Sequence, residues 1–150
     1  MSAVNRHATA VILGDRGILI MGPSGSGKTA LALTLIRQAI AQRRFARLVA
    51  DDQAFLSVAA GRLLARAPAT IAGLAEVRGL GPTSVTSEAT AVIDLAVMLE
   101  AADNAPRMRE PQRFEYDGIG VERLALPARS AIQSALAIAA WLGWQPFQPS

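Results

Sequence analysis

The chain has 150 residues, 51% hydrophobic and 18% charged, a composition that suits one globular domain and excludes a disordered chain. It has no cysteine and one histidine, which excludes disulfide scaffolds, cysteine-type zinc sites, thiol catalysis and multi-histidine metal sites. The net charge is +3, and 14 of the 15 basic residues are arginines spread along the chain, a distribution more typical of a solvated surface than of a nucleic-acid groove. We therefore expect a single domain over residues 1–150 with no nucleic-acid partner.

No apolar run approaches the ~20 residues needed to span a bilayer, and residues 1–7 lack the apolar core of a signal peptide. These features predict a cytoplasmic protein without a membrane partner. The only lysine, Lys28, stands out in a chain that otherwise uses arginine for positive charge.

The first part of the chain alternates short apolar segments with turns. Residues 8–13 and 18–21 predict two strands, and the Gly-Asp-Arg-Gly segment 14–17 predicts the turn between them. A glycine-rich loop over 22–27 leads into a predicted helix over 28–42, because its leucine, isoleucine and alanine residues recur at helical spacing.

The middle of the chain predicts further strands. Residues 48–50 are apolar and predict a buried strand that ends at Asp51. Residues 54–59 and 62–67 predict a hairpin around an Ala-Gly turn. Residues 91–100 form the longest strand candidate, and their nearly continuous apolar character predicts a central position in the sheet.

The C-terminal third predicts a second helix after a polar segment. Residues 107–120 carry proline and glycine and predict a loop or an irregular hairpin. Residues 130–143 predict a helix with Ser130 as its N-cap and Gly143 at its end. We expect one face of this helix to be buried, namely Ile132, Leu136, Ala139 and Leu142.

The proline-rich tail 144–150 predicts an extended segment. The apolar side chains near this end either pack around the last helix, which we favour, or form an interface: Trp141, Trp144 and Phe147.

One motif follows the second predicted strand. It matches G-x-x-x-x-G-K-[ST] in full, and the strand before it and helix after it supply the context the motif requires. Its residues are Gly22, Pro23, Ser24, Gly25, Ser26, Gly27, Lys28 and Thr29. Glycines let backbone N–H groups converge on phosphate oxygens, and the helix N-terminus adds its dipole. Lys28 can reach the β- and γ-phosphates and Thr29 can ligate Mg²⁺, so the motif predicts ATP-type nucleotide and magnesium without specifying a reaction.

Two adjacent carboxylates, Asp51 and Asp52, follow the predicted strand 48–50. The phosphate loop lies at that end of such a sheet, so we expect both to face the bound phosphates. One can hold the metal or its water shell while the other accepts a proton from an attacking hydroxyl. The alternative is an Asp pair that only begins a turn.

With these motifs the chain resembles the catalytic, C-terminal-type domain of the HPr kinase/phosphorylase family, in the short form known from alphaproteobacteria. The resemblance is good from about residue 4 to residue 100 and weak after residue 106. Four stretches carry it: His7, the loop Gly22 to Thr29, the run Arg47-Leu48-Val49-Ala50-Asp51-Asp52, and Glu76-Val77-Arg78-Gly79-Leu80-Gly81. The last stretch is similar to the family signature Glu-Ile-Arg-Gly-Leu-Gly.

The resemblance implies roles for individual residues. His7 would lie near the transferred phosphoryl group, and Lys28 would contact the phosphates. Asp51 would be the general base that takes the proton from the target serine, and Asp52 would support the metal and phosphate region. Residues 78–81 would belong to a segment tied to catalysis in both directions.

The resemblance also implies a metal site and a catalytic arginine. Thr29 and Glu76 would ligate Mg²⁺. The family has an active-site arginine further along the chain, and Arg113 is the best placement for it, with Arg123 and Arg129 as alternatives.

The implied fold is α/β, a P-loop-containing mixed sheet flanked by helices and similar to the nucleotide-binding core of phosphoenolpyruvate carboxykinase. The implied function is an ATP- and Mg²⁺-dependent serine kinase that acts on the phosphocarrier protein HPr in regulation of a phosphotransferase system. The reverse phosphorylase reaction stays open, and a homo-oligomer is expected. Two alternatives remain: a non-catalytic nucleotide-sensing regulatory domain, and a small-molecule kinase or NTPase that shares only the phosphate loop.

Overall fold

The computed structural model describes residues 3–148, which form a mixed α/β domain. The helices are α1 (Lys28–Ala41), the short 3-10 helix η1 (Ala69–Ile71) and α2 (Ala131–Leu142). The strands are β1 (Val4–Arg6), β2 (Ala8–Leu13), β3 (Arg16–Met21), β4 (Ala46–Ala50), β5 (Ala54–Ala59), β6 (Arg62–Arg66), β7 (Leu74–Val77), β8 (Gly81–Ser84), β9 (Thr90–Glu100), β10 (Gln112–Tyr116) and β11 (Ile119–Pro127).

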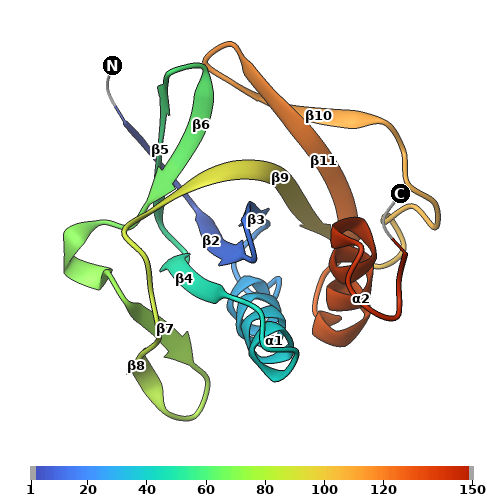
Figure 1. Ribbon diagram of the computed structural model, residues 1–150, viewed down its shortest axis with the longest axis horizontal. Helices are drawn as coiled ribbons and strands as arrows, with labels where there is room; N and C mark the ends of the chain where they lie inside the picture. The colour runs from blue at the N-terminus through green and yellow to red at the C-terminus, as the bar shows by residue number, and fades with distance from the viewer. Residues whose placement is uncertain (1–2, 149–150) are drawn as a thin grey trace.

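The strands form one large curled sheet and one small hairpin (Figure 1). The path through the large sheet is β1-β5-β6-β9-β3-β2-β4, with β11 also pairing with β9 and β10 pairing with β11. β9 runs parallel to β3 and β11, and the other neighbours are antiparallel. The expected mixed sheet and the central place of the longest strand are therefore confirmed. β7 and β8 pair only with each other and project to one side.

The core forms two clusters, one on each face of the sheet, and a one-residue bulge in β9 changes which face its side chains join. Gly17 of β3 pairs with Ile93, but the next pair uses Leu95, so Asp94 is an extra residue on β9. The Gly17 N–H donates a hydrogen bond to Asp94 Oδ2 at 2.9 Å, which gives one carboxylate oxygen a partner at the bulge. An extra residue reverses the alternation of side chains, and Ile93 and Leu95 accordingly lie in different clusters.

Both helices pack on one face of the sheet and contact each other (Figure 1). Leu31 and Leu35 of α1 and Ile138 of α2 are fully buried in this cluster, as helical spacing predicts for α1. The second cluster lies on the opposite face, where β5, β6 and the β10–β11 hairpin close over the sheet, and the Tyr116 hydroxyl donates to Leu56 O at 3.0 Å.

The predicted buried face of the second helix is wrong in part. Ile132 is 72% exposed and Leu136 is 50% exposed, whereas Ser134 and Ala135 are buried. The helix is apolar on nearly every side, so its periodicity does not identify the buried face. Ser130 holds the N-cap position as predicted, but its hydroxyl bonds to the Ala128 carbonyl and makes no capping bond.

Residues 144–148 of the C-terminal tail are not extended as predicted, and the last two positions of that prediction, 149 and 150, lie outside the described residues. Gly143 ends α2 with φ of +72°, and the chain then turns so that Trp144 enters the helix-side core. The Arg44 guanidinium lies 4.5 Å from the centroid of the Trp144 ring, and Trp141 donates to Glu122 Oε1 at 3.1 Å. These contacts support the packing interpretation over the interface for both tryptophans.

Five strands were not predicted as regular strands: β1, β7, β8, β10 and β11. β1 is a short, exposed edge strand without an apolar pattern. Residues 107–120 contain a loop and then the regular β10–β11 hairpin, whose second strand continues to Pro127 beside β9. Of the two alternatives for this segment, the hairpin is therefore closer, but it is regular and longer than expected.

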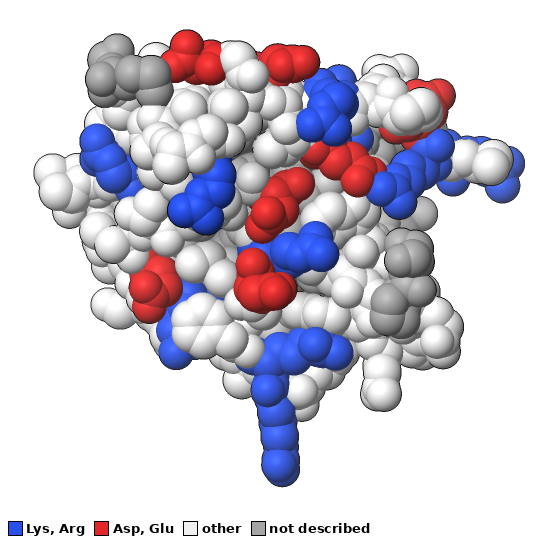
Figure 2. Space-filling view, turned by 45° about the horizontal axis from the view of Figure 1, so that its top comes forward, with Lys and Arg blue, Asp and Glu red and all other residues white. Residues whose placement is uncertain are grey.

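Basic and acidic side chains are intermixed on the face shown in Figure 2, in keeping with the scatter of arginines along the sequence. Within residues 3–148, neither α-helix has the length and apolar character of a membrane span.

The packing of the tail yields a stability prediction. Trp144→Ala removes a side chain that is only 7% exposed and should lower the free energy of unfolding by about 3–5 kcal/mol. Ile132→Ala, on the exposed side of α2, should change it by no more than about 0.5 kcal/mol. Urea titration of both variants would measure the difference, and equal small effects would show that the tail does not belong to the core.

Candidate functional site

The phosphate loop connects the end of β3 to the start of α1, as predicted. Gly27, the residue before the helix, has φ of +93°, a conformation that favours glycine. The Ser26 N–H donates to Pro23 O at 3.1 Å within the loop, and the Arg129 N–H donates to Ser26 O at 2.8 Å from the segment before α2. The loop is thus held in a compact turn by a hydrogen bond of its own and by one from the segment before α2.

Ser26 gives the loop a spare polar group. Its hydroxyl is buried and has no hydrogen-bond partner within the described part of the chain. It lies against Gly22, where a Cβ would come within 2.6 Å of Ser26 Oγ, so the loop needs glycine there. Buried hydroxyls normally have partners, and a phosphate oxygen in the loop would supply one. This orphaned group fits a loop built to receive an anion.

Lys28 is buried at the first turn of α1, with its side chain 4% exposed. Its ammonium donates to Gly22 O at 3.0 Å and Pro23 O at 3.2 Å, and it lies 3.4 Å from Asp52 Oδ1. The cation is therefore held between the loop that would cradle phosphates and a carboxylate from the end of β4. When phosphates bind, the Lys28 ammonium would turn from these carbonyls to the phosphate oxygens. A compact ammonium with three donors suits this change of partners better than a planar guanidinium.

Asp51 ties three segments of the chain together. Its Oδ1 accepts hydrogen bonds from the hydroxyls of Thr29 at 2.7 Å and Thr9 at 3.2 Å. Its Oδ2 accepts the backbone N–H of Glu76 at 2.9 Å. Asp51 is only 7% exposed, so an incoming protein cannot readily reach this carboxylate.

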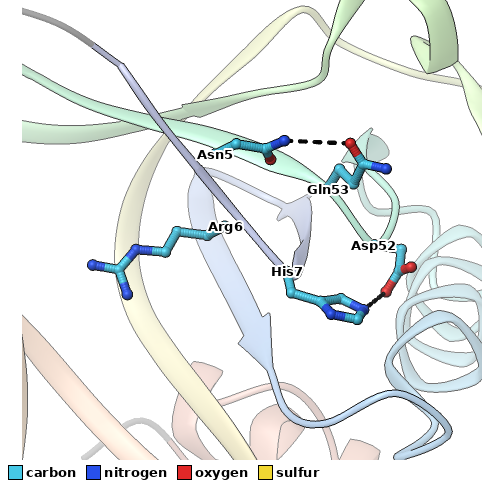
Figure 3. Close-up of a pocket in the computed structure, with 5 residues that line it drawn as sticks. All are labelled: Asn5, Arg6, His7, Asp52 and Gln53. Atoms are coloured by element: carbon cyan, nitrogen blue, oxygen red, sulfur yellow. Dashed lines mark hydrogen bonds and ion pairs between the residues drawn. The ribbon is translucent and has the colours of Figure 1, made fainter.

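Asp52 has the opposite environment. Its side chain is 55% exposed, and its Oδ1 lies 2.5 Å from His7 Nε2 (Figure 3). The residue has φ of +65°, and its N–H donates to the buried Thr9 hydroxyl at 3.0 Å. The unusual backbone turns the second carboxylate away from Asp51 and toward His7 and Lys28. The two aspartates are therefore not equivalent.

A shallow polar pocket opens beside Asp52. Its volume is about 380 Å³, and it is lined by Asn5, Arg6, His7, Asp52 and Gln53. Figure 3 shows the side chains of Asn5 and His7 on one side of β1 and that of Arg6 on the other. The opposite directions of Asn5 and Arg6 follow from strand geometry, in which neighbouring residues face opposite sides, and His7 directly follows the strand.

The signature segment forms the tip of the β7–β8 hairpin. Glu76 reaches the site through its backbone N–H, and its side chain is exposed. Arg78, Gly79 and Leu80 form the exposed turn. No group of three or more His, Cys, Asp or Glu side chains suited to a metal occurs within residues 3–148. The metal role of Glu76 stays a prediction.

The three candidate arginines lie in different places. Arg113 donates to Gly120 O at 2.6 Å across the β10–β11 turn, and Arg123 lies 3.7 Å from Glu100. Only Arg129 adjoins the phosphate loop, through its backbone N–H. Its φ of +53° marks the sharp turn between β11 and α2. Of the three, Arg129 therefore has the placement that best suits a site role.

Thr29 fits the ligand chemistry of magnesium. A hydroxyl has one donor and two acceptor lone pairs, so Thr29 can donate to Asp51 and still offer oxygen to a cation. Mg²⁺ needs only one or two protein groups when phosphates supply other ligands. Thr29 can therefore serve as a magnesium ligand together with phosphate oxygens.

Sequence reasoning missed Thr9, Asn5 and Gln53. Thr9 had a signal, because it is the only polar residue in the apolar segment 8–13. Asn5 and Gln53 had none, since their importance depends on the pairing of β1 with β5.

Comparisons with known proteins identify the family of the chain. The family model for the HPr serine kinase C-terminal domain matches residues 1–141. A protein named HPr kinase/phosphorylase from Caldicellulosiruptor bescii is 31% identical over 147 residues, covering 90% of this chain and 45% of the relative. Another of that name from Clostridium tetani is 33% identical over 120 residues, covering 79% of this chain and 36% of the relative. The chain thus spans less than half the length of these relatives. The expected placement in an alphaproteobacterial branch stays a prediction.

A solved structure has the same fold. The Hpr(Ser) kinase/phosphatase from Coxiella burnetii superposes with a TM-score of 0.78 at 21% identity, covering 93% of this chain and 88% of that one. The particular similarity to the phosphoenolpyruvate carboxykinase core stays a prediction. Given the match over residues 1–141, the chain belongs to the HPr serine kinase C-terminal domain family.

Proposed function

We propose that this chain is an ATP- and Mg²⁺-dependent serine kinase that acts on HPr or an HPr-like phosphocarrier. The observation that carries the proposal is the placement of Asp52 between Lys28 of the phosphate loop and His7. An exposed carboxylate beside a phosphate-binding lysine suits transfer of a phosphoryl group to a hydroxyl. The names of the curated relatives supply HPr as the acceptor.

In the proposed reaction, the serine oxygen attacks the γ-phosphorus of ATP in line. The new O–P bond forms as the bond to the ADP oxygen breaks, and the serine proton passes to a carboxylate. Lys28 and the loop N–H groups stabilise the charge on the phosphate oxygens. Mg²⁺, when bound, would be held in part by Thr29 and would offset the negative charge of the phosphate oxygens.

The resemblance implies that Asp51 is the general base and that Asp52 supports the metal. The geometry favours the opposite assignment. Asp51 is buried and its oxygens already accept three hydrogen bonds, one of them from Thr29. Asp52 is open to an incoming hydroxyl and has His7 beside it. We therefore assign proton acceptance to Asp52, supported by His7, and positioning of Thr29 for the metal to Asp51.

The first test is transfer of label from γ-labelled ATP in the presence of Mg²⁺. Wild-type HPr should become labelled, and HPr with its target serine replaced by alanine should not. Steady ATP hydrolysis without labelled HPr would favour an NTPase or small-molecule kinase. ATP binding with neither transfer nor hydrolysis would favour a nucleotide-sensing domain.

The second test compares two isosteric variants. Asp52→Asn should lower kcat for transfer by about 10²–10⁴-fold, the range expected for loss of a general base, while MgATP binding largely survives. Asp51→Asn should weaken Mg²⁺-dependent ATP binding by about 10–100-fold, as for other groups that position a metal ligand. Calorimetry and single-turnover kinetics would separate the two effects. The assignment would be contradicted if Asp51→Asn still bound MgATP but no longer transferred phosphate, while Asp52→Asn stayed active. That result would identify Asp51 as the general base.

Other expectations belong to the same proposal. The phosphorylase reaction stays open, although the relatives carry both activities in their name. Assembly into a homo-oligomer and a cytoplasmic location also stay predictions.

A further inference from the structure

We infer that the pocket between β1 and the residues after β4 is the subsite for the acceptor polypeptide, and that Asn5 and Gln53 bind its main chain. The inference rests on the proposed function and adds the residues that recognise the acceptor. It concerns the side of the site away from the nucleotide loop.

The pocket arises where two paired strands separate. The ladder between β1 and β5 ends at the pair Arg6 and Ala54. Beyond that pair, one chain continues through His7 into β2, and the other leads back through Gln53 to Asp52 and β4. The fork leaves a depression of about 380 Å³, within the ~300–1,000 Å³ range of ligand pockets. Since β1 is the edge of the sheet, no further strand of residues 3–148 covers it.

The side chains in this fork are suited to a peptide. Asn5 Nδ2 donates to Gln53 Oε1 at 3.3 Å, a long bond between two exposed amides (Figure 3). Each amide has two donors and an acceptor with two lone pairs, so the pair keeps unused capacity of both kinds. A peptide group presents one N–H and one C=O, which the two amides together can match. Neither residue carries the charge that would select an ionic small molecule.

The spacing along the chain places the amides of Asn5 and Gln53 within reach of a peptide whose serine lies at Asp52. Asn5 lies in β1 and His7 directly follows the strand, with both side chains on the same side of the chain, so their Cα atoms are at most about 7 Å apart. An extended peptide that places its serine hydroxyl at Asp52 would therefore set a peptide group about two residues away against Asn5 and Gln53. Lys28, 3.4 Å from Asp52 Oδ1, marks where the phosphate side begins. The pocket thus leads from solvent to the reacting atoms.

The occupant we propose is the serine-bearing segment of the acceptor protein in an extended conformation. A free amino acid or small alcohol would fill only the end next to Asp52 and would gain nothing from the amides. The subsite therefore predicts a preference for polypeptide acceptors.

The test uses Asn5→Ala, Gln53→Ala and the double variant, with Gln133→Ala on the exposed side of α2 as the matched control. Initial rates of transfer to HPr should give an acceptor KM raised about tenfold in the double variant, the effect of losing one or two hydrogen bonds. The KM for ATP, the kcat at saturating HPr and the midpoint of thermal unfolding should stay near the wild-type values. Gln133→Ala should match the wild type throughout.

An unchanged acceptor KM in the double variant would overturn the subsite while leaving the kinase intact. A lower kcat with unchanged acceptor KM would also overturn it, because it would mean that Asn5 and Gln53 only support His7. Failure of the wild-type chain to label HPr at all would overturn the proposed function, and the inference with it.

Discussion

The carboxylate of Asp51 is the interaction on which the site depends. It accepts hydrogen bonds from Thr29 at the start of α1, Thr9 in β2 and the backbone of Glu76 in β7. These residues lie far apart in the sequence. Losing the carboxylate would remove the acceptor of all three donors, and the cost should be largest, about 1–3 kcal/mol, for the buried Thr9 hydroxyl. The same bonds position Thr29 and the signature hairpin.

Asp52 gains its role from its neighbour. The Thr9 hydroxyl donates to Asp51 and accepts the N–H of Asp52, so one buried side chain fixes both residues. With φ of +65°, Asp52 then points toward His7 and Lys28. One carboxylate is buried and the other is exposed, which is the difference that the proposed roles of the two aspartates rest on. This arrangement joins the nucleotide loop to the pocket at Asn5 and Gln53.

Much of the fold follows from local patterns. The strand, phosphate loop and α1 have the strongest signals, and the hairpin of β5 and β6 was predicted nearly to its bounds. The exposed Ile132 was not predictable, because α2 is apolar on nearly every side and tertiary packing chooses the face. The bulge at Asp94 was also not predictable, since a single carboxylate in an apolar strand does not reveal its partner.

In the site, Lys28 and the aspartates were evident from the sequence. The different exposure of Asp51 and Asp52 depends on backbone angles that no sequence motif specifies.

The most direct measurement of this account is hydrogen exchange at the backbone amide of Glu76. Glu76 lies opposite Pro82 in the β7–β8 hairpin, and its N–H donates to Asp51 instead of to the ladder. In Asp51→Ala this amide should exchange at least about tenfold faster than in the wild type, as expected for loss of a hydrogen bond to a buried carboxylate. The Leu80 amide, which bonds to Val77 O within the same hairpin, should keep its rate and serves as the internal control. An unchanged rate at Glu76 would contradict the claim that Asp51 holds the signature hairpin to the phosphate loop.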